Sequence, residues 1–153
     1  GDGPDFMRMW VGHATTHAFV NRFRDENEAN VKLIYALAAY ICAWHNGKYA
    51  PTWWYYSRYL NNGSRPISVG SAILNRIDLA NEASVAQAGF FLHYLQQRNP
   101  EAFSSFWSSF LAGEGDTFSL RKACLPDKDD AAMDSDFKSF TEDYKKSFRP
   151  WDK

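Results

Sequence analysis

Two histidines, His13 and His17, stand four residues apart in a stretch with helical periodicity. In an α-helix, residues at this spacing lie one turn apart on the same face, so both imidazoles point the same way. Two such imidazoles can bind a divalent transition metal, zinc above all. The same spacing also arises by chance in helices whose histidines pack or face solvent. The pair therefore marks a candidate metal site without establishing one.

The residues between these histidines lack the group that hydrolysis would need. Zinc peptidases carry the sequence H-E-x-x-H, in which the glutamate activates the metal-bound water. Here the run reads His13-Ala14-Thr15-Thr16-His17, so Ala14 stands where that glutamate belongs. Because loss of a general base usually lowers the rate by orders of magnitude, hydrolysis by the standard mechanism is not expected.

Three blocks of sequence resemble, in order and spacing, the C-terminal helical half of peptidase-MA-like gluzincins, zinc metallopeptidases with glutamate as the third ligand. The blocks cover residues 13–20, 33–41 and 85–95, and the resemblance extends from about residue 10 to about residue 144. In the family, the first two blocks read like H-E-A-T-H and E-G-L-A-E-Y, and the third is a helix of the form Y-x-x-A-x-x-L-V-x-Y-L. The resemblance implies a fold like the helical half of a zincin.

Carried over residue by residue, the resemblance implies a degenerate site. His13 and His17 match the two histidine ligands. Ala14 falls at the catalytic glutamate, Tyr35 at the third ligand, and Ala39 at the second glutamate of that block. Three carboxylates that the family uses are thus absent, which favours a pseudo-metallopeptidase over an active enzyme.

Other metal ligands near the pair are few. After Glu28 the next acidic residue is Asp78, so the region expected to supply the third ligand contains no carboxylate. Cys42 and His45, near the end of the second expected helix, are the alternative third ligands. A cysteine in an apolar helix is more often a core residue, and His93 has the same interpretation. No cofactor is therefore expected, with zinc as the alternative.

A dense aromatic cluster offers a different kind of site. Exposed rings of this kind stack on sugars or hold peptides. The alternative, which we favour, is a short helix over residues 53–60 that buries one side of the cluster. The candidate binding residues are Trp53, Trp54, Tyr55, Arg58 and Tyr59.

Helical periodicity recurs along the chain, and no convincing run of alternating strand residues is present. We therefore predict a compact all-α domain of about six to eight helices, with the helix over residues 30–44 at its centre. Residues 127–136 are interpreted as a solvated acidic linker. Helices are expected over residues 9–23, 30–44, 53–60, 69–79, 84–97, 100–112, 117–124 and 134–148.

Several of these helices have recognisable ends. Asp25 and Glu28 have the spacing of a capping box before the second helix. Asn99, followed by proline, and Asp116 are expected N-caps of later helices. The segment 113–115, Gly-Glu-Gly, is expected to end the aromatic helix.

The overall composition limits the classes of partner that the chain can bind. A chain of 153 residues, 45% hydrophobic and 23% charged, fits one globular domain. A net charge of -1 gives no basic excess for nucleic acid, and no apolar run reaches the roughly 20 residues of a membrane span. Cys42 and Cys124 are compatible with one disulfide or with two buried thiols.

The chain begins with Gly-Asp-Gly-Pro, which is neither an initiator methionine nor a signal sequence. We expect residues 1–8 to be a disordered or vector-derived N-terminus, residues 9–149 one helical peptidase-like domain, and residues 150–153 a tail. The resemblance implies an upstream domain in a larger, extracytoplasmic or secreted parent.

Three functional hypotheses follow. The leading one is a non-catalytic peptidase-like domain that binds a peptide or protein, or acts as a scaffold. The second is a zinc-dependent hydrolase that uses His13 and His17 with a non-standard third ligand. The third is an aromatic-rich module for peptide or carbohydrate with incidental histidines.

Overall fold

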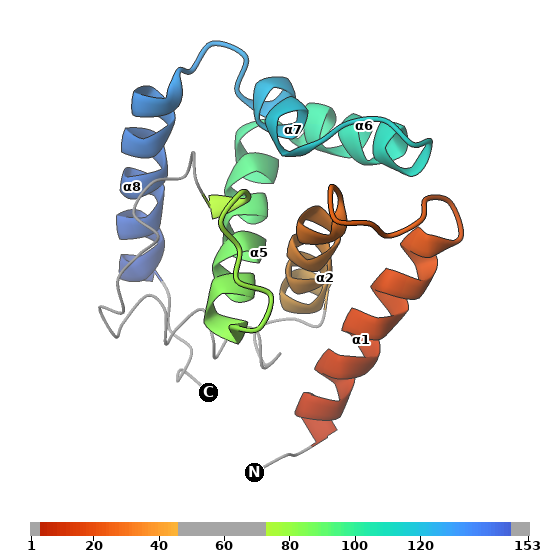
Figure 1. Ribbon diagram of the computed structural model, residues 1–153. Helices are drawn as coiled ribbons and strands as arrows, with labels where there is room; N and C mark the ends of the chain where they lie inside the picture. The colour runs from red at the N-terminus through yellow and green to blue at the C-terminus, as the bar shows by residue number, and fades with distance from the viewer. Residues whose placement is uncertain (1–3, 46–72, 148–153) are drawn as a thin grey trace.

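The helices of the computed structural model run along most of the part of the chain that it describes, residues 4–45 and 73–147 (Figure 1). This part contains no β-strand, so the predicted all-α class is confirmed there. None of its helices combines the length and the apolar character needed to cross a bilayer. The helices are α1 (Pro4–Asn21), α2 (Val31–His45), α5 (Glu82–Arg98), α6 (Pro100–Leu111), α7 (Thr117–Cys124) and α8 (Asp130–Ser147).

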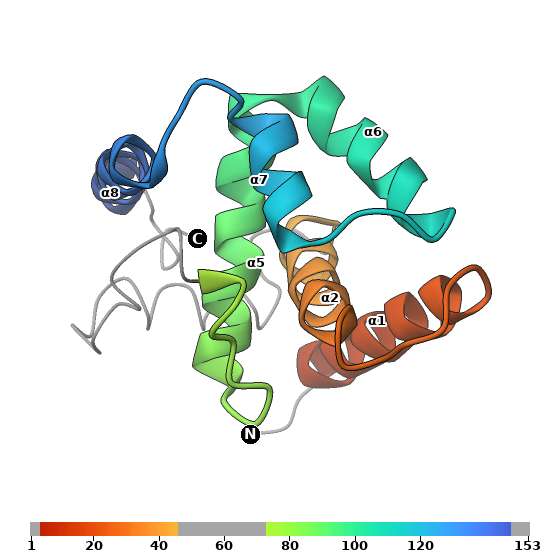
Figure 2. The same cartoon turned by 45° about the horizontal axis from the view of Figure 1, so that its top comes forward.

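The centre of the domain is α5, which contacts α2, α6, α7 and α8 (Figures 1 and 2). The prediction placed the helix over residues 30–44 at the centre, but the corresponding α2 lies between α5 and the outer helix α1. The reason is visible in the burial pattern, because positions 86–92 of α5 are buried without a break. A helix buried on all sides must have neighbours all round.

Aromatic rings fill the interface between α5 and α8. The rings of Phe91 and Phe137 meet edge to face at 5.2 Å, and those of Phe90 and Tyr144 at 5.1 Å. Rings at such separations stabilise a core beyond the area that they bury. The predicted inward positions on the last helix, Phe137, Phe140 and Tyr144, all pack against the core, whereas Phe148 lies outside the described residues.

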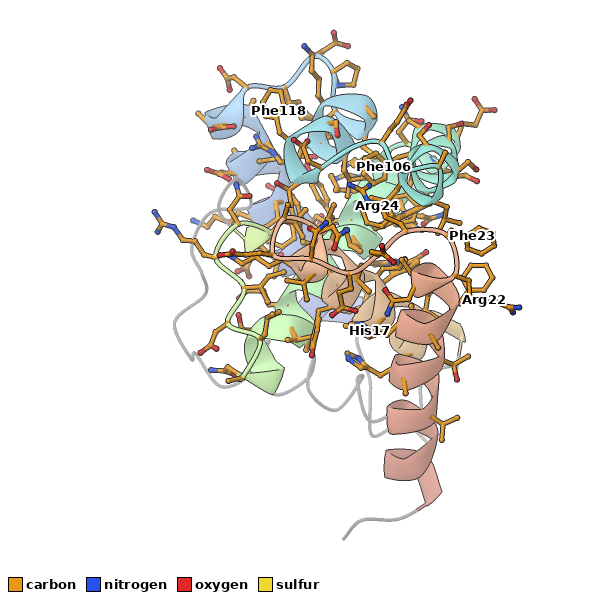
Figure 3. All side chains as sticks on the ribbon, turned by 45° about the vertical axis from the view of Figure 1, so that its right-hand side comes forward. His17, Arg22, Phe23, Arg24, Phe106 and Phe118 are labelled. Atoms are coloured by element: carbon orange, nitrogen blue, oxygen red, sulfur yellow. The ribbon has the colours of Figure 1, made fainter. Side chains whose placement is uncertain are left out.

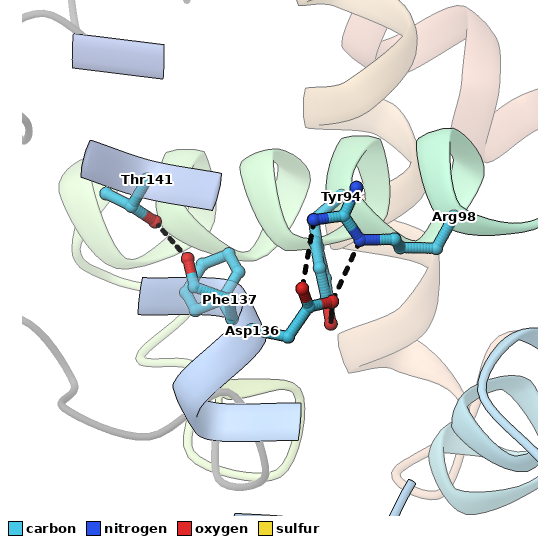
Figure 4. A network of polar contacts seen from close by, with 5 residues as sticks. All are labelled: Tyr94, Arg98, Asp136, Phe137 and Thr141. Atoms are coloured by element: carbon cyan, nitrogen blue, oxygen red, sulfur yellow. Dashed lines mark hydrogen bonds and ion pairs between the residues drawn. The ribbon is translucent and has the colours of Figure 1, made fainter. Parts of the chain in front are cut away.

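A polar network also joins α5 to α8 (Figure 4). The Tyr94 hydroxyl donates to Asp136 Oδ2 at 2.7 Å, and Arg98 donates through Nε and Nη2 to the same carboxylate at 2.8 and 3.0 Å. Because the Tyr94 side chain is fully buried, its hydroxyl needs this partner. Burial, and then Asp136, raise the pKa of Tyr94, while hydrogen bonds from Arg98 hold the pKa of Asp136 below its ordinary value.

The interpretation of residues 127–136 as a linker is wrong for their second half, because α8 begins at Asp130. The Asp129 side chain accepts a hydrogen bond from the Ala132 amide at 2.8 Å, as an N-cap does. Met133, one turn into the helix, is buried in the core. A capped first turn and an apolar anchor therefore extend the helix into the acidic stretch.

The predicted caps of α6 and α7 are confirmed. Asn99 Oδ1 accepts from the Ala102 amide at 3.1 Å, and proline occupies the first turn of α6. Asp116 and Ser119 form a reciprocal capping box at the start of α7. Each cap joins residues only three positions apart, so it can be predicted without knowing how the helices pack.

The capping box predicted for Asp25 and Glu28 is wrong. The reciprocal pair before α2 is formed instead by Asn27, whose side chain accepts from the Asn30 amide at 3.1 Å, and Asn30, whose side chain accepts from the Asn27 amide at 2.8 Å. Asn30 Nδ2 also donates to the Asp25 carbonyl at 2.8 Å. The chain therefore turns two residues later than the acidic pair suggested.

Two glycines follow α6 with left-handed backbone, Gly113 at φ 99° and Gly115 at φ 87°. A Cβ on Gly115 would lie 2.8 Å from Cε2 of the buried Phe106 ring, whereas a Cβ on Gly113 would meet nothing within 4 Å. We expect Gly113→Ala to lower the free energy of unfolding by about 1 kcal/mol and Gly115→Ala by up to about 3 kcal/mol, because only the second adds a clash to the backbone strain. Urea denaturation of both variants measures the difference, and equal losses would contradict it.

Both cysteines are buried, Cys42 in α2 and Cys124 at the end of α7, and no disulfide joins them. The sequence left their pairing open, and the structure resolves it in favour of two thiols. Burial raises the pKa of each thiol to about 11. Neither residue is therefore a thiolate near neutral pH.

Candidate functional site

The two histidines of α1 lie side by side, as their spacing predicted, and both face α2. Their ring centroids are 4.7 Å apart. Tyr35 of α2 meets both rings edge to face, with centroid separations of 5.0 Å to His13 and 4.6 Å to His17. The residue that the resemblance places at the third-ligand position is thus in direct contact with the pair. It contributes a phenol ring where the family has a carboxylate.

Glu26 joins this cluster from the loop between α1 and α2. Its Oε2 lies 2.7 Å from His17 Nδ1. Glu26 was not predicted, because it lies only nine positions after His17, before the region where the resemblance places the third ligand. The chain turns directly after α1, where the Phe23 and Arg24 amides donate to the Val20 carbonyl at 2.9 Å, and the loop that follows holds Glu26 against His17.

The surroundings of His13 favour its neutral imidazole. The pKa of His13 is lowered, first by burial and then by His17, while the Glu26 charge opposes the change. Neutral imidazole is the form that binds metals. With Nδ1 bonded to Glu26, His17 has one further ring nitrogen, Nε2, which is buried and has no hydrogen-bond partner.

These residues fit a metal only in part. A carboxylate on one imidazole nitrogen and a lone pair on the other is the usual arrangement of a metal-binding histidine. Among residues 4–45 and 73–147, however, no group of three histidine, cysteine or acidic side chains is placed to hold a metal ion. Cys42 is buried and protonated, and the side chain of His45 lies outside the described residues.

The remaining candidates separate into two groups. Trp53, Trp54, Tyr55, Arg58 and Tyr59 lie outside the described residues. His93 is described, and it packs at the interface of α5 and α8, with its ring 5.8 Å from Phe140 and 6.0 Å from Tyr144.

A groove of about 450 Å³ lies between α1, α2 and α6, where the sequence predicted no binding site. Trp107 of α6 is only half-buried and lines the groove. The rings of Tyr40 and Phe103 meet at 5.4 Å inside it. The lining is predominantly apolar and includes Phe19, Leu37, Tyr40, Phe103, Trp107 and Leu111.

The exposed side of α1 continues this apolar surface. Phe19 is 51% exposed and Phe23 is 57% exposed, and their rings lie 5.2 Å apart. Figure 3 shows Phe23 and Arg22 directed outward at the end of α1, while His17 points toward the body of the domain. Positions 11–21 contain no Asp, Glu, Lys or Arg. This run without charged residues is the feature of the sequence that could have predicted an exposed apolar surface on α1.

Comparison of the chain with protein-family models, with characterised proteins and with solved structures gives no match. The geometry of the described residues is therefore the basis for assigning a function to the domain.

Proposed function

We propose that this chain is a non-catalytic, peptidase-like binding domain within a larger protein, and that the groove between α1, α2 and α6 receives an apolar segment of a protein partner. The observation that carries the proposal is the groove itself, with Phe19 and Phe23 exposed beside it. Contiguous apolar surface that stays in contact with water is characteristic of interaction sites. Aromatic side chains such as Trp107 commonly dominate the affinity of such sites.

The residues around the histidine pair support a role without catalysis. Ala14 is exposed at the position where the resemblance places the general base. The nearby carboxylate, Glu26, is already bonded to His17 Nδ1. A carboxylate held by an imidazole is not free to take a proton from a substrate water.

Selection of a random peptide display library on the domain tests the binding proposal. We expect selected peptides to carry large apolar residues and to lose at least about tenfold in affinity on Phe19→Glu, because burial of a phenylalanine contributes about 1.5–3 kcal/mol. Phe118→Glu is the matched control, since Phe118 is 64% exposed on α7 and does not line this groove. Isothermal titration calorimetry of the three proteins measures the affinities.

Peptides that bind equally to wild type and to Phe19→Glu would place the binding surface elsewhere and contradict the proposal. A library that yields no groove-dependent binder at micromolar concentration would also contradict it. Cleavage of the selected peptides by the wild-type domain would refute the non-catalytic part alone.

A second candidate, a zinc-dependent hydrolase, is favoured by the unpaired Nε2 of His17. His13 and His17 would hold the metal through imidazole nitrogens, and Glu26 would fix the tautomer of His17. Zinc, when bound, supplies Lewis acidity and a water of lowered pKa. The third ligand and the general base would then come from outside the described residues.

Zinc titration distinguishes this candidate from the first. Tight uptake of one zinc per chain that His17→Ala abolishes, and that Glu26→Gln weakens by about 10- to 100-fold, would support it. Uptake that is unchanged in His17→Ala would remove the histidine pair from consideration as a metal site.

A further inference from the structure

The groove is built entirely from helices, and this restricts what can occupy it. Within a helix, the main-chain N–H and C=O groups already bond to one another. Four side chains that line the groove carry polar atoms: Thr15, Thr16, Tyr40 and Trp107. Thr16 Oγ1 already donates to the Gly12 carbonyl at 2.9 Å, and Trp107 Nε1 is buried below the surface, where the main chain of a ligand does not reach it. The groove therefore offers almost no partners for the main chain of a ligand.

This shortage separates two kinds of peptide. An extended segment brings one unpaired donor and one unpaired acceptor per residue, and burying them without partners is unfavourable. An α-helical segment satisfies its own main chain and presents only side chains. Apolar side chains suit the lining, which contains no Asp, Glu, Lys or Arg.

We infer that the occupant of the groove is an amphipathic α-helix of a protein partner, with its apolar stripe packed against α1, α2 and α6. This inference rests on the proposed function and specifies the class of partner. The lining residues Phe103, Trp107 and Leu111 follow one another at intervals of four residues along α6, which corresponds to about 12 Å of helix. A partner helix needs two to three turns, with apolar residues at positions i, i+3, i+4 and i+7, to cover that length.

Charge at one end of the groove orients the partner. The Arg22 amide donates to the Phe19 carbonyl at 3.2 Å, so Arg22 follows the groove residue Phe19 by one turn of the chain, and its exposed side chain is directed outward next to Phe23 (Figure 3). Arg24 lies over the Phe110 ring at 4.4 Å and donates to main-chain oxygens of α6 and the loop after it. The nearby Glu26 is already bonded to His17. Arg22 forms no ion pair with the described residues, so its positive charge is available to the incoming helix. The partner helix therefore carries an acidic residue at this end.

Two designed peptides of about 16 residues test the inference on the whole chain. Both carry a leucine stripe at helical spacing and a terminal glutamate, and one has prolines at two positions off the stripe, so that only the other can form a helix. Titration into ¹⁵N-labelled protein follows the amides of α1, α2 and α6, and calorimetry gives the affinities. The matched protein variants are Phe19→Glu and Arg22→Glu, with Phe118→Glu as the control.

We expect the helical peptide to perturb the groove amides and to bind at least about tenfold more tightly than the proline peptide. Phe19→Glu should abolish this preference, Arg22→Glu should weaken binding several-fold at low salt, and Phe118→Glu should change neither. Equal or tighter binding of the proline peptide at the same amides would overturn the helical occupant and leave the proposed function standing. Concentration-dependent self-association that Phe19→Glu abolishes, with no response to either peptide, would overturn it in favour of a second copy of the chain. Binding of both peptides away from the groove amides would overturn both proposals.

Discussion

Replacing Phe91 with alanine is expected to lower the free energy of unfolding by about 3–5 kcal/mol, a large part of the stability of a domain of this size. Phe91 is fully buried in the central helix α5. Its ring contacts Phe137 at 5.2 Å and Tyr94 at 5.6 Å, so its removal leaves a cavity between α5 and α8. Urea denaturation followed by circular dichroism measures the loss.

Two variants serve as controls for this cavity. Phe91→Leu keeps most of the apolar volume and should be much less destabilising. Phe118→Ala removes an aromatic ring that is 64% exposed, so its effect should stay within about 0.5 kcal/mol. A loss for Phe91→Ala no larger than that of Phe118→Ala would mean that α8 does not pack on α5 as described.

The second large effect is expected from pH, through His93. Burial lowers its pKa from the ordinary value of 6.5 to about 4. The unfolded chain therefore binds a proton between these two values while the folded chain does not, so stability is fully present above pH 6.5 and is lost as the pH falls toward 4. The difference between the two pKa values corresponds to roughly 3 kcal/mol.

Unfolding at a series of pH values between 7 and 4, for wild type and for His93→Gln, isolates this contribution. Glutamine keeps hydrogen-bonding capacity but does not titrate in this range, so the variant should show a flatter profile. His13, whose pKa is also lowered, acts in the same direction in both proteins and cancels in the comparison. Parallel profiles for the two proteins would show that His93 does not stay neutral in the fold.

The elements that local sequence determines were predictable, and those set by tertiary packing were not. Asn99 and Asp116 cap their helices as expected, because each cap needs only the next three residues. The choice of α5 over α2 as the central helix could not be predicted, since both are strongly apolar and only the arrangement of their neighbours separates them. The acidic start of α8 was predicted to be a linker because of its composition, whereas the Asp129 side chain caps a helix there.

The candidate site divides in the same way. The juxtaposition of His13 and His17 follows from helix geometry alone. Glu26 reaches His17 only because the chain turns directly after α1, at Phe23 and Arg24, and no periodic pattern encodes such a turn. The groove combines residues more than 80 positions apart, from Phe19 to Trp107, so it emerges only once α1 and α6 are placed on α2.

The two buried thiols give the domain a pair of internal reporters. Cys42 lies in α2 and Cys124 at the end of α7, and each must become exposed and ionised before a reagent can modify it. The alkylation half-life of each thiol therefore measures how often its own helix opens in the native ensemble. With no other cysteine in the chain, these two half-lives map the order in which the two ends of the core come apart.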